Sequence, residues 1–453
     1  MVPSARKSAA FCATQLHQQL RALPQPEHYV VAYSGGLDSH VLLHALVTIR
    51  GQCAIPVRAI HVQHGLHPAA GDWAAHCQIV CQALDVPLQV VALQLQPSPG
   101  ASLEAVAREA RYAACWQDAL PGTMLLTAHH ADDQAETVLL QLLRGAGIAG
   151  LAAMPVCRTT ASGWHARPCL SWSRQALQQY AQQQALTWID DPSNLNTDFD
   201  RNYLRQQVIP LLQARWPAAS QTLARSASHV AAALPLVQAQ ARQDLAQSCD
   251  SDGRLQVSAL RRLPEIRCQQ VLRAWILQAG HPVPSQAQLS EIIDQTLEAG
   301  SDSQLRIGWQ QTELRRYRDV LWLLHRPLPT PPDQPLVWPT EEQVLALPAG
   351  CGVLHRIPAE QGIPGRYWQQ GRISVRWRSQ GLRCRPVGRQ GSRSFKKLCQ
   401  AYGIPPWQRP YVPLLYLDNQ LIAVADICMC LEPVTGENCY QVQWLPADHS
   451  MPG

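Results

Sequence analysis

Short apolar runs alternate with amphipathic stretches over the first half of the chain. The runs Tyr29–Tyr33, Val57–Val62, Leu88–Leu93 and Met124–Ala128 are mostly apolar at consecutive positions, as strands buried on both faces are. Between them lie segments such as Val41–Ile49, in which apolar residues recur at helical spacing. This alternation predicts an α/β fold with a doubly wound parallel sheet over residues 1–216.

The pattern changes after Trp216. Segments rich in Ala, Gln and Leu have helical periodicity, and residues 302–325 then alternate in the manner of strands. We expect a mainly helical middle domain over residues 217–325. The segment 326–339 is dense in proline, which excludes a helix and favours a stiff linker. Short strands and turns predict a small mixed α+β domain over residues 340–453.

Composition narrows the class of protein. The 453 residues allow about two to four domains, and no apolar run approaches the ~20 residues of a membrane span. The N-terminal residues lack the apolar centre of a signal peptide, so we expect a cytoplasmic protein with no membrane partner.

The 15 cysteines include no CxxC pair, and the closest pairs are Cys77/Cys81 and Cys428/Cys430. That spacing favours neither a zinc ribbon nor a redox dithiol, and we interpret the thiols as small buried apolar residues.

Positive charge is concentrated in one stretch of the C-terminal domain. The net charge of the chain is only +5, but Gln361–Leu417 contains eleven Arg or Lys residues and no Asp or Glu. A solvated basic face is the ordinary interpretation of such a run. The absence of any counter-charge favours a polyanionic partner instead.

The segment SGGLDS, Ser34–Ser39, follows the first predicted strand and opens the next predicted helix. Ligands of an α/β sheet bind beyond the carboxyl ends of its strands. There the amides of a helix N-terminus attract an anion, Gly35 and Gly36 allow close approach of a phosphate, and the serine hydroxyls add donors. Because no GxxxxGK[ST] motif is present, we expect Asp38 to bind Mg²⁺, which would neutralise a pyrophosphate leaving group.

Polar side chains also follow the second and fourth predicted strands. The segments HVQHGLH, 61–67, and TAHHADDQAET, 127–137, end at the same edge of the sheet as SGGLDS. A single histidine at a strand end is usually structural, whereas several titratable groups at one edge indicate a site. Five side chains are expected to converge there: His61, His64, His129, Asp132 and Asp133. Glu136, on the helix that follows, is either part of this site or a structural cap partner.

SGGLDS in this setting resembles the PP-loop of the N-type ATP pyrophosphatases, which cleave ATP between its α and β phosphates. Further segments are similar to one family of that group, the tRNA(Ile)-lysidine synthetases. The family pattern HxxDDQxET falls on His129–Thr137, and DxSN followed by RNxxR falls on Asp191–Arg205. AREARY at 107–112 and the pair Arg167–Pro168 agree with the family as well. Gly388–Tyr416 is similar to the C-terminal domain of its longer bacterial forms.

The resemblance implies a two-step ligase reaction with ATP and Mg²⁺. ATP adenylates the C2 oxygen of the wobble cytidine in the isoleucine tRNA that bears the anticodon CAU. The ε-amine of free L-lysine then attacks C2 and forms lysidine, which pairs with adenosine and changes the tRNA from methionine to isoleucine identity. A homodimer is left open. The acid that the family commonly has near Gln175–Ala176 is absent here, so that segment receives no role.

The resemblance and the local chemistry together give the motif residues expected roles. ATP is expected at Ser34, Gly35, Gly36, Leu37, Asp38, Ser39, His61 and Arg111. Mg²⁺ is expected at Asp38 and Asp133. Catalysis, including the capture and deprotonation of lysine and the binding of the AMP phosphate, is expected at Asp38, His129, Asp132, Asp133, Arg201 and Arg205. The tRNA backbone is expected at Arg383, Arg385, Arg389, Lys396 and Lys397, with Trp377 and Trp407 stacking on unpaired bases.

Two other functions fit parts of the sequence. A PP-loop tRNA thiolase would also bind ATP and tRNA, but such enzymes generally need a CxxC pair or a reactive cysteine, and this chain has no CxxC. A non-catalytic tRNA-binding protein with a vestigial nucleotide site is disfavoured by the intact SGGLDS and HxxDDQ motifs. Pyrophosphate release with and without lysine distinguishes the three functions.

Overall fold

A computed structural model gives the fold of the chain. It describes residues 10–63, 70–93, 103–192, 196–298, 300, 305–369, 372–377, 380–388, 391–430, 432 and 434–447. The chain packs as two compact units, residues 1–236 and residues 237–453. No helix in the described part of the chain has the length and apolar character needed to cross a membrane.

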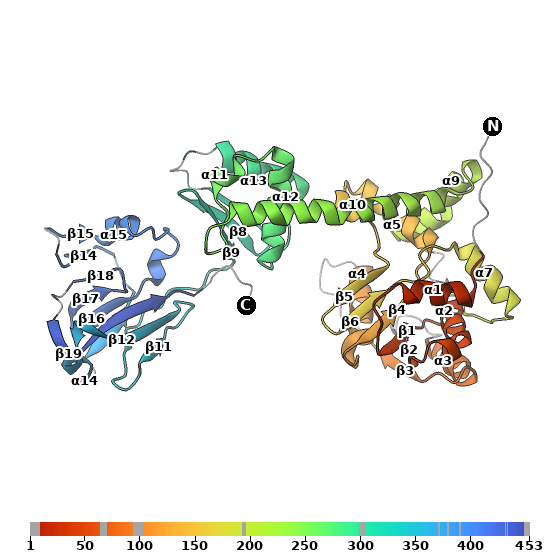
Figure 1. Cartoon of the computed structure of the whole chain (residues 1–453), viewed down its shortest axis with the longest axis horizontal. Coiled ribbons are helices and arrows are strands. Elements are labelled where there is room, and N and C mark those ends of the chain that lie inside the picture. The colour runs from red at the N-terminus through yellow and green to blue at the C-terminus, as the bar shows by residue number, and fades with distance from the viewer. Residues whose placement is uncertain are drawn as a thin grey trace. The chain divides into compact units, whose positions relative to one another are not determined.

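The first unit contains a six-stranded sheet in the order β3-β2-β1-β4-β6-β5 (Figure 1). Its strands are β1 His28–Ala32, β2 Val57–Gln63, β3 Leu88–Ala92, β4 Thr123–Leu126, β5 Cys157–Thr160 and β6 Gly163–Ala166. Neighbouring strands are parallel except β5 and β6, which pair antiparallel. The four apolar runs of the sequence nearly coincide with β1 to β4, so the predicted α/β sheet is confirmed. The β5–β6 hairpin extends it at one edge.

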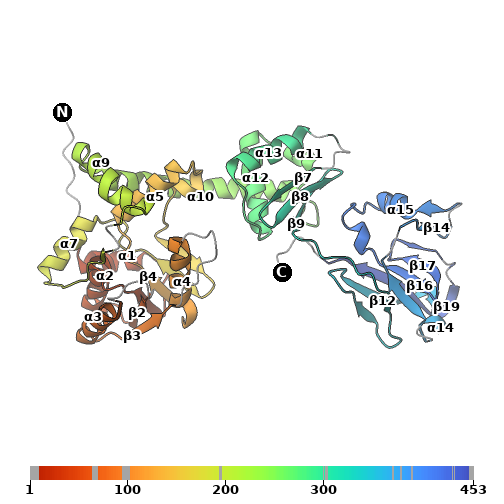
Figure 2. The same ribbon diagram turned by 180° about the vertical axis from the view of Figure 1, so that it is seen from behind.

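Helices cover both faces of this sheet. The helices of the first unit are α1 Ala13–Arg21, α2 Leu37–Thr48, α3 Ala70–Ala83, α4 Leu103–Gln117, α5 Ala131–Leu143, α6 Ile148–Leu151, α7 Arg174–Gln183, α8 Asp200–Tyr203 and α9 Ile209–Arg215, of which α6 and α8 pack against α5. Tyr29 and Val31 of β1 join the larger core with α1, α2 and α7, whereas Val30 joins a smaller core with Cys115 of α4. Successive strand residues point to opposite faces, so this burial explains why β1 is apolar throughout. Figure 2 shows α3 beside β2 and β3, against which it packs.

The order of the strands in the sheet indicates where a ligand site is expected. The chain continues from β1 to β2 on one side and reaches β4 on the other side, so the strand order reverses at β1 and β4. Doubly wound sheets bind ligands beyond the carboxyl ends of the strands at such a reversal. Residues 33–36 follow β1, and residues 127–130 follow β4. The two motifs that the sequence singled out therefore leave adjacent strands at the same edge.

The second unit begins within a long helix and has two cores. α10 Ala219–Ser248 crosses the division between the units and is followed by α11 Val257–Leu260, α12 Glu265–Gln278 and α13 Gln286–Glu298. An antiparallel sheet of β7 Arg306–Trp309, β8 Thr312–Tyr317 and β9 Val320–His325 completes this part. Leu272, Ile292 and Leu314 lie in its common core. The helical middle region and the strand-like end that the sequence predicted are both present.

The C-terminal part is built from small antiparallel sheets. Its strands are β10 Leu336–Val337, β11 Val344–Ala346, β12 Val353–Pro364, β13 Ile373–Arg376, β14 Arg383–Cys384, β15 Arg393–Ser394, β16 Leu414–Leu417, β17 Gln420–Val424, β18 Cys428–Met429 and β19 Val434–Leu445. They form the sheets β10-β13-β16-β17-β18, β11-β12-β19 and β14-β15. Two helices, α14 Gly365–Gln369 and α15 Phe395–Ala401, accompany them. This is the mixed α+β arrangement that was expected.

The proline-rich segment is only partly a linker. Leu336 and Val337 pair with Val375 and Ser374 of β13, and Trp338 is 1% exposed. An edge strand tolerates neighbouring prolines because only one of its sides needs backbone donors. The end of the expected linker therefore belongs to the C-terminal sheet. The domain boundaries at residues 216, 325 and 339 stay predictions.

Candidate active site

The turn after β1 is shaped by its own serine side chains. Ser39 Oγ accepts a hydrogen bond from the Ser34 N–H at 3.2 Å and donates to the Gly36 carbonyl at 3.0 Å. Ser34 Oγ lies 3.1 Å from Ser39 Oγ and accepts a longer hydrogen bond, 3.4 Å, from the Gly36 N–H. The hydroxyls thus fix the turn from within. The amides in the first turn of α2 have no partners inside their own helix and are placed to bind an anion.

Gly35 cannot be replaced without disturbance. Its φ is +81°, in the left-handed region that favours glycine. A Cβ atom there would lie 2.8 Å from Ile189 Cδ1 and 2.9 Å from Cys77 Sγ. The Ile189 N–H donates to the Gly35 carbonyl at 3.0 Å, so the segment before the DxSN motif holds the turn directly.

His130 forms the corner between β4 and α5. Its backbone N–H donates to Asp133 Oδ2 at 3.0 Å, and the Asp133 N–H donates to His130 Nδ1 at 3.4 Å. This reciprocal capping box holds Asp132 and Asp133 in the first turn of α5. Carboxylates are favoured at that end of a helix by its dipole.

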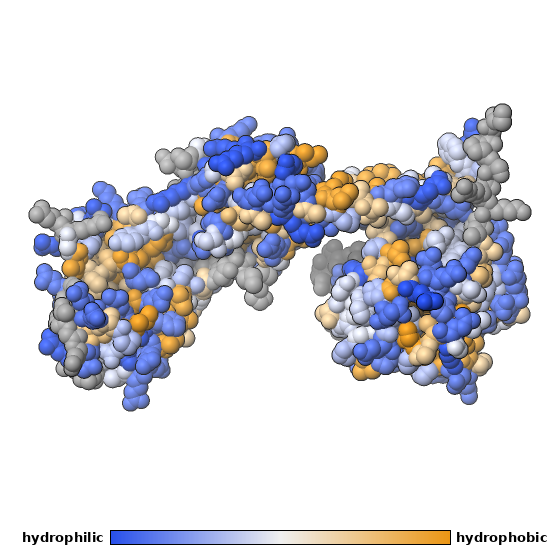
Figure 3. Space-filling view, viewed as in Figure 1, coloured by the Kyte–Doolittle hydropathy of each residue, from blue (hydrophilic) through white to orange (hydrophobic). Residues whose placement is uncertain are grey.

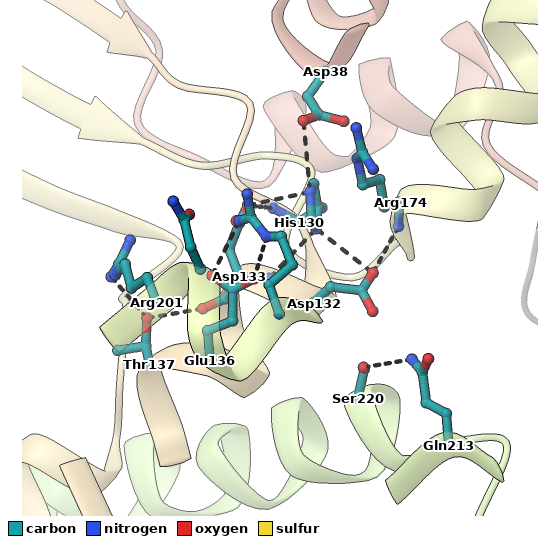
Figure 4. A network of polar contacts seen from close by, with 12 residues as sticks. Asp38, His130, Asp132, Asp133, Glu136, Thr137, Arg174, Arg201, Gln213 and Ser220 are labelled. Atoms are coloured by element: carbon teal, nitrogen blue, oxygen red, sulfur yellow. Dashed lines mark hydrogen bonds and ion pairs between the residues drawn. The ribbon is translucent and has the colours of Figure 1, made fainter. Parts of the chain in front are cut away.

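The imidazole of His130 lies among three carboxylates and is 1% exposed (Figure 4). Its Nε2 is 3.6 Å from Asp38 Oδ2 and 3.4 Å from Asp133 Oδ2, and its Nδ1 is 3.6 Å from Asp132 Oδ2. Burial alone would lower the pKa of His130, but Asp133 and Asp38 outweigh burial and raise the pKa to about 9. A protonated imidazole offsets the mutual repulsion of the carboxylates. Its Nδ1 then carries a proton and no longer accepts from the Asp133 N–H, whereas Asp133 Oδ2 still accepts from the His130 N–H. His130 thereby connects the SGGLDS and HxxDDQ motifs.

The three carboxylates differ in how many of their oxygens are occupied. Asp133 accepts from Arg205 Nη2 at Oδ1 and from the His130 N–H at Oδ2, both at 3.0 Å. Asp132 Oδ2 accepts from the Arg174 N–H, at the start of α7, at 2.8 Å. Asp38 Oδ1 is buried and has no hydrogen-bond partner among the described residues. A buried carboxylate oxygen without a donor is costly, and it marks the place where a cation would be most stabilised.

Arg205 anchors the helical segment 200–215 to α5. Its Nε donates to Glu136 Oε1 at 2.6 Å and its Nη2 to Glu136 Oε2 at 3.1 Å. The Glu136 side chain is 0% exposed, and its burial raises the pKa of its carboxyl although Arg205 opposes the shift. Arg201 Nη2 donates to Thr137 Oγ1 at 3.2 Å. The two arginines both contact residues of α5, and their present partners are protein groups. Glu136 pairs with Arg205, which is itself a predicted site residue, so both interpretations of Glu136 stay predictions.

The remaining predicted site residues of the first unit lie as follows. His129 Nδ1 is 2.9 Å from Thr127 Oγ1, and the His129 side chain is half-buried. His61 is 5% exposed with its Nδ1 3.0 Å from the Tyr33 carbonyl, a position that favours support of the turn over contact with ATP. Arg111 is exposed on α4, and its role in ATP binding stays a prediction. His64, Ser193 and Asn194 lie outside the described residues.

The predicted tRNA-binding residues are mostly exposed. Arg383, Arg385, Lys396 and Lys397 all lie on the surface around β14 and α15, whereas Arg389 lies outside the described residues. In Figure 3 hydrophilic and hydrophobic residues are interspersed over the region where Figure 1 labels β14, β15 and α15.

The two tryptophans of this region do not fit the predicted stacking role. Trp377 is 4% exposed and belongs to the C-terminal core, so its prediction is wrong. Trp407 packs edge-on against Trp322, with ring centroids 5.8 Å apart, and the Arg315 guanidinium lies 5.1 Å from its ring centroid. Trp377 thus supports the C-terminal core, and Trp407 packs against β8 and β9.

Sequence reasoning missed His130 and Arg174. A capping residue followed three positions later by an acid is a recognisable helix start, and HHAD at 129–132 followed by Asp133 offers that signal. Arg174 contributes its backbone N–H, and no pattern of side chains could have indicated that contact.

Three family models match the chain. A PP-loop domain matches residues 9–212, a TilS substrate binding domain matches residues 255–322, and a TilS substrate C-terminal domain matches residues 373–444. The matches follow one another along the chain in the order of the α/β, middle and C-terminal parts.

Curated relatives cover nearly the whole chain. The tRNA(Ile)-lysidine synthase of Coxiella burnetii is 40% identical over 421 residues, which is 93% of each chain. That of Alkalilimnicola ehrlichii is 42% identical and covers 91% of this chain and 92% of its own length. A solved U34-tRNA thiolase, NcsA from Methanococcus maripaludis, covers 48% of this chain and 77% of its own, at 16% identity and a TM-score of 0.39. That structural likeness is too weak to carry an argument.

Proposed function

Because the chain belongs to the tRNA(Ile)-lysidine synthase family, we infer that the cluster at the ends of β1 and β4 is where it forms lysidine on isoleucine tRNA. The chain is a ligase that uses ATP through its PP-loop domain. The observation that carries the placement is the contact of His130 with Asp38 of one motif and with Asp132 and Asp133 of the other.

We propose that the ATP phosphates bind over the start of α2. Donors in this place are backbone amides, because the serine hydroxyls already shape the turn. Amides fixed before the substrate arrives need no reorganisation when charge develops on the leaving pyrophosphate. Arg201 and Arg205 approach the same site from the segment 200–215, and Arg201, with a single bond to Thr137, is the freer of the two to bind the AMP phosphate.

The donor set fits a magnesium ion at Asp38. Its buried Oδ1 is an oxygen without a donor, and Mg²⁺ is bound in proteins by one or two carboxylates together with substrate phosphates. Asp133, the second expected ligand, already accepts at both oxygens and fits less well. When bound, Mg²⁺ neutralises charge on the phosphates. Asp38 Oδ2 stays paired with His130 Nε2, 3.6 Å away, at the edge of the site.

Lysine capture is best supported at Asp132. The ε-amine of free lysine is mostly protonated at neutral pH. It therefore needs a carboxylate that binds it and a group that accepts its proton. Asp133 is committed to Arg205 and His130, whereas Asp132 has one oxygen outside its bond to α7. His130 is 1% exposed and so has little access to a bound lysine, and we assign the role of proton acceptor to Asp132 or to His129.

The tRNA is proposed to lie across the exposed basic residues of the C-terminal part. Exposed guanidinium and ammonium groups bind phosphates without reading sequence, and they fit the stem of a tRNA. The substrate is the isoleucine tRNA with the CAU anticodon, whose wobble cytidine reaches the cluster at β1 and β4. These substrates are cytoplasmic compounds, and we propose that the protein acts there. The homodimer stays a prediction.

The cysteines near the site argue against thiolation. Burial raises the pKa of Cys77, beside the SGGLDS turn, to about 12, and burial also raises the pKa of Cys169. A thiolase nucleophile needs a lowered pKa and access to solvent. Both thiols are buried, and their raised pKa values make them poor nucleophiles.

The test is mass analysis of isoleucine tRNA after incubation with the protein and ATP, with and without lysine. With lysine the wobble cytidine should gain the mass of lysidine formation. With Asp132→Asn, adenylated tRNA should accumulate, because lysine capture fails while the ATP site is intact. The matched variant Asp118→Asn changes an exposed carboxylate that has no expected role at the site, and it should behave as the wild type. Equal loss of both steps in Asp132→Asn would refute the assignment of lysine capture.

A further inference from the structure

Three cysteine thiols gather in the C-terminal part of the chain. Cys384 ends β14, Cys428 begins β18, and Cys430 follows β18. Their Sγ atoms all lie within 4.8 Å of one another. Among the residues that the structure describes, no other set of three or more His, Cys, Asp or Glu ligand atoms is as compact. The interpretation of the cysteines as small buried apolar residues did not anticipate that these three lie together.

Backbone hydrogen bonds set this arrangement independently of the thiols. The Cys430 N–H donates to a carbonyl of β17 at 2.8 Å, and the Val387 N–H donates to the Met429 carbonyl at 3.0 Å. The second bond brings the chain after β14 against β18. Residues i and i+2 of a strand point to the same face, so Cys428 and Cys430 present both sulfurs on one side, where Cys384 meets them.

The geometry suits a metal better than a disulfide. Two residues that are i and i+2 in a strand have Cα atoms about 6.7 Å apart, at the upper limit for a disulfide. The three thiols are free, and side-chain hydrogen bonds connect Cys428 with Cys430 and with Cys384. Tetrahedral zinc with Zn–S bonds of about 2.3 Å needs sulfurs about 3.8 Å apart. The present Sγ–Sγ separations, all within 4.8 Å, need only small side-chain rotations to reach about 3.8 Å.

We propose that Cys384, Cys428 and Cys430 form a binding site for one thiophilic metal ion, Zn²⁺, with water in the fourth position. Thiolates select soft or borderline ions such as Zn²⁺ over Mg²⁺, so this site does not compete with the one proposed at Asp38. Each thiol loses its proton when it ligates the metal, and binding therefore releases protons to the buffer.

The ion joins β14 to β18 and so holds the β14–β15 hairpin on the five-stranded sheet. Arg383 and Arg385 flank Cys384 in the sequence, and both are exposed. The metal thereby fixes the position of part of the basic surface. This consequence for tRNA rests on the proposed function, whereas metal binding itself does not.

The experiment uses the untagged full chain, freed of metal by a chelator and kept reduced. Native mass spectrometry should show one Zn²⁺ per chain after addition of one equivalent, and Co²⁺ should give thiolate-to-metal charge-transfer absorption. Cys428→Ser and Cys430→Ser should each weaken Zn²⁺ binding at least about tenfold. Cys351→Ser is the matched control, because Cys351 is buried in the same core and should leave Zn²⁺ binding unchanged.

A measurement on the wild type guards against variants that fail to fold. Zn²⁺ should protect Cys384, Cys428 and Cys430 from alkylation and leave the labelling of Cys12 unchanged. The proposal is overturned if the chain binds no stoichiometric Zn²⁺, or if Cys351→Ser loses as much affinity as Cys428→Ser. If Zn²⁺ binds but tRNA affinity is the same with and without it, the metal site stands and the role of the hairpin in tRNA binding fails.

Discussion

Replacing Arg205 by Gln tests whether its pair with Glu136 holds the active site together. Arg205 makes two hydrogen bonds to Glu136 and one to Asp133, and the Glu136 side chain is 0% exposed. Glutamine retains much of the length of arginine but supplies no positive charge. The variant therefore leaves a buried carboxylate without its counterion.

The expected loss follows from the exposure of the two partners. Removing one partner of a buried ion pair destabilises a protein by about 3–5 kcal/mol, because the other charge stays buried. The Arg205 side chain is 36% exposed, so solvent already screens part of the pair, and we expect about 3 kcal/mol. For a unit of this size that corresponds to a fall in Tm of about 6–12 °C.

The loss should depend on pH in a defined direction. Burial raises the pKa of Glu136 in the folded protein, and removal of Arg205 raises it further. A raised folded-state pKa means that the folded protein binds the proton more readily than the unfolded chain does. Its contribution to stability is therefore present at low pH and is lost as the pH rises through the folded-state pKa. The difference in Tm between wild type and variant should widen from about pH 5 to about pH 8.

Scanning calorimetry of the full chain at both pH values measures this difference. Arg201→Gln is the matched control, since it loses a hydrogen bond to Thr137 and a weaker electrostatic attraction to Glu136, and it should cost about 1 kcal/mol. The double variant Glu136→Gln with Arg205→Gln removes both charges and should recover most of the loss. Two results would show that Glu136 does not need Arg205 as its counterion: a loss below about 1 kcal/mol for Arg205→Gln at the higher pH, or a double variant no more stable than the single one.

Three further predictions concern the ATP turn and the basic surface. Asp38→Asn should slow pyrophosphate release by at least ~10²-fold without lowering Tm, and a near-normal rate would exclude Asp38 from the chemistry. Gly35→Ala, at φ +81°, should cost about 1–2 kcal/mol in stability and slow pyrophosphate release as well; unchanged melting and rate would show that the turn tolerates a side chain. Charge reversal at Arg385, Lys396 and Lys397 should weaken tRNA binding and flatten its log–log salt dependence by about 0.7–0.9 per lost contact, with ATP affinity unchanged. An unchanged slope would mean that this surface is only solvated.

The sequence predicted most of the sheet and the edge at which the site lies. Unbroken apolar runs are a strong signal because parallel strands are buried on both faces, and β1 to β4 all carry it. The hairpin of β5 and β6 carries no such signal, since Arg158 and Thr159 of its edge strand are exposed. Motif spacing was sufficient to place Asp38 and Asp133 together, because each follows its own strand at a fixed distance.

The contacts within the site were not predictable in the same way. Glu136 and Arg205 are 69 residues apart, and their pairing depends on how the segment 200–215 docks on α5. The cysteine site has the same character, because Cys384 reaches Cys428 only through the pairing of short strands. Aromatic residues beside basic ones predicted base stacking, whereas burial placed Trp377 in the core. Local sequence patterns predict local structure, whereas contacts between distant residues depend on how the helices and strands pack together.

The separation of Glu136 from Arg205 has a consequence during synthesis of the chain. At about 5–20 residues per second, a ribosome reaches Arg205 roughly 3–14 s after it has made Glu136, which precedes it by 69 residues. Sheet and helix formation take far less time than that. During the interval α5 must either carry Glu136 protonated or stay undocked, because a buried charge without a partner is unstable. With Glu136 ionised, α5 can therefore dock only after Arg205 has been made.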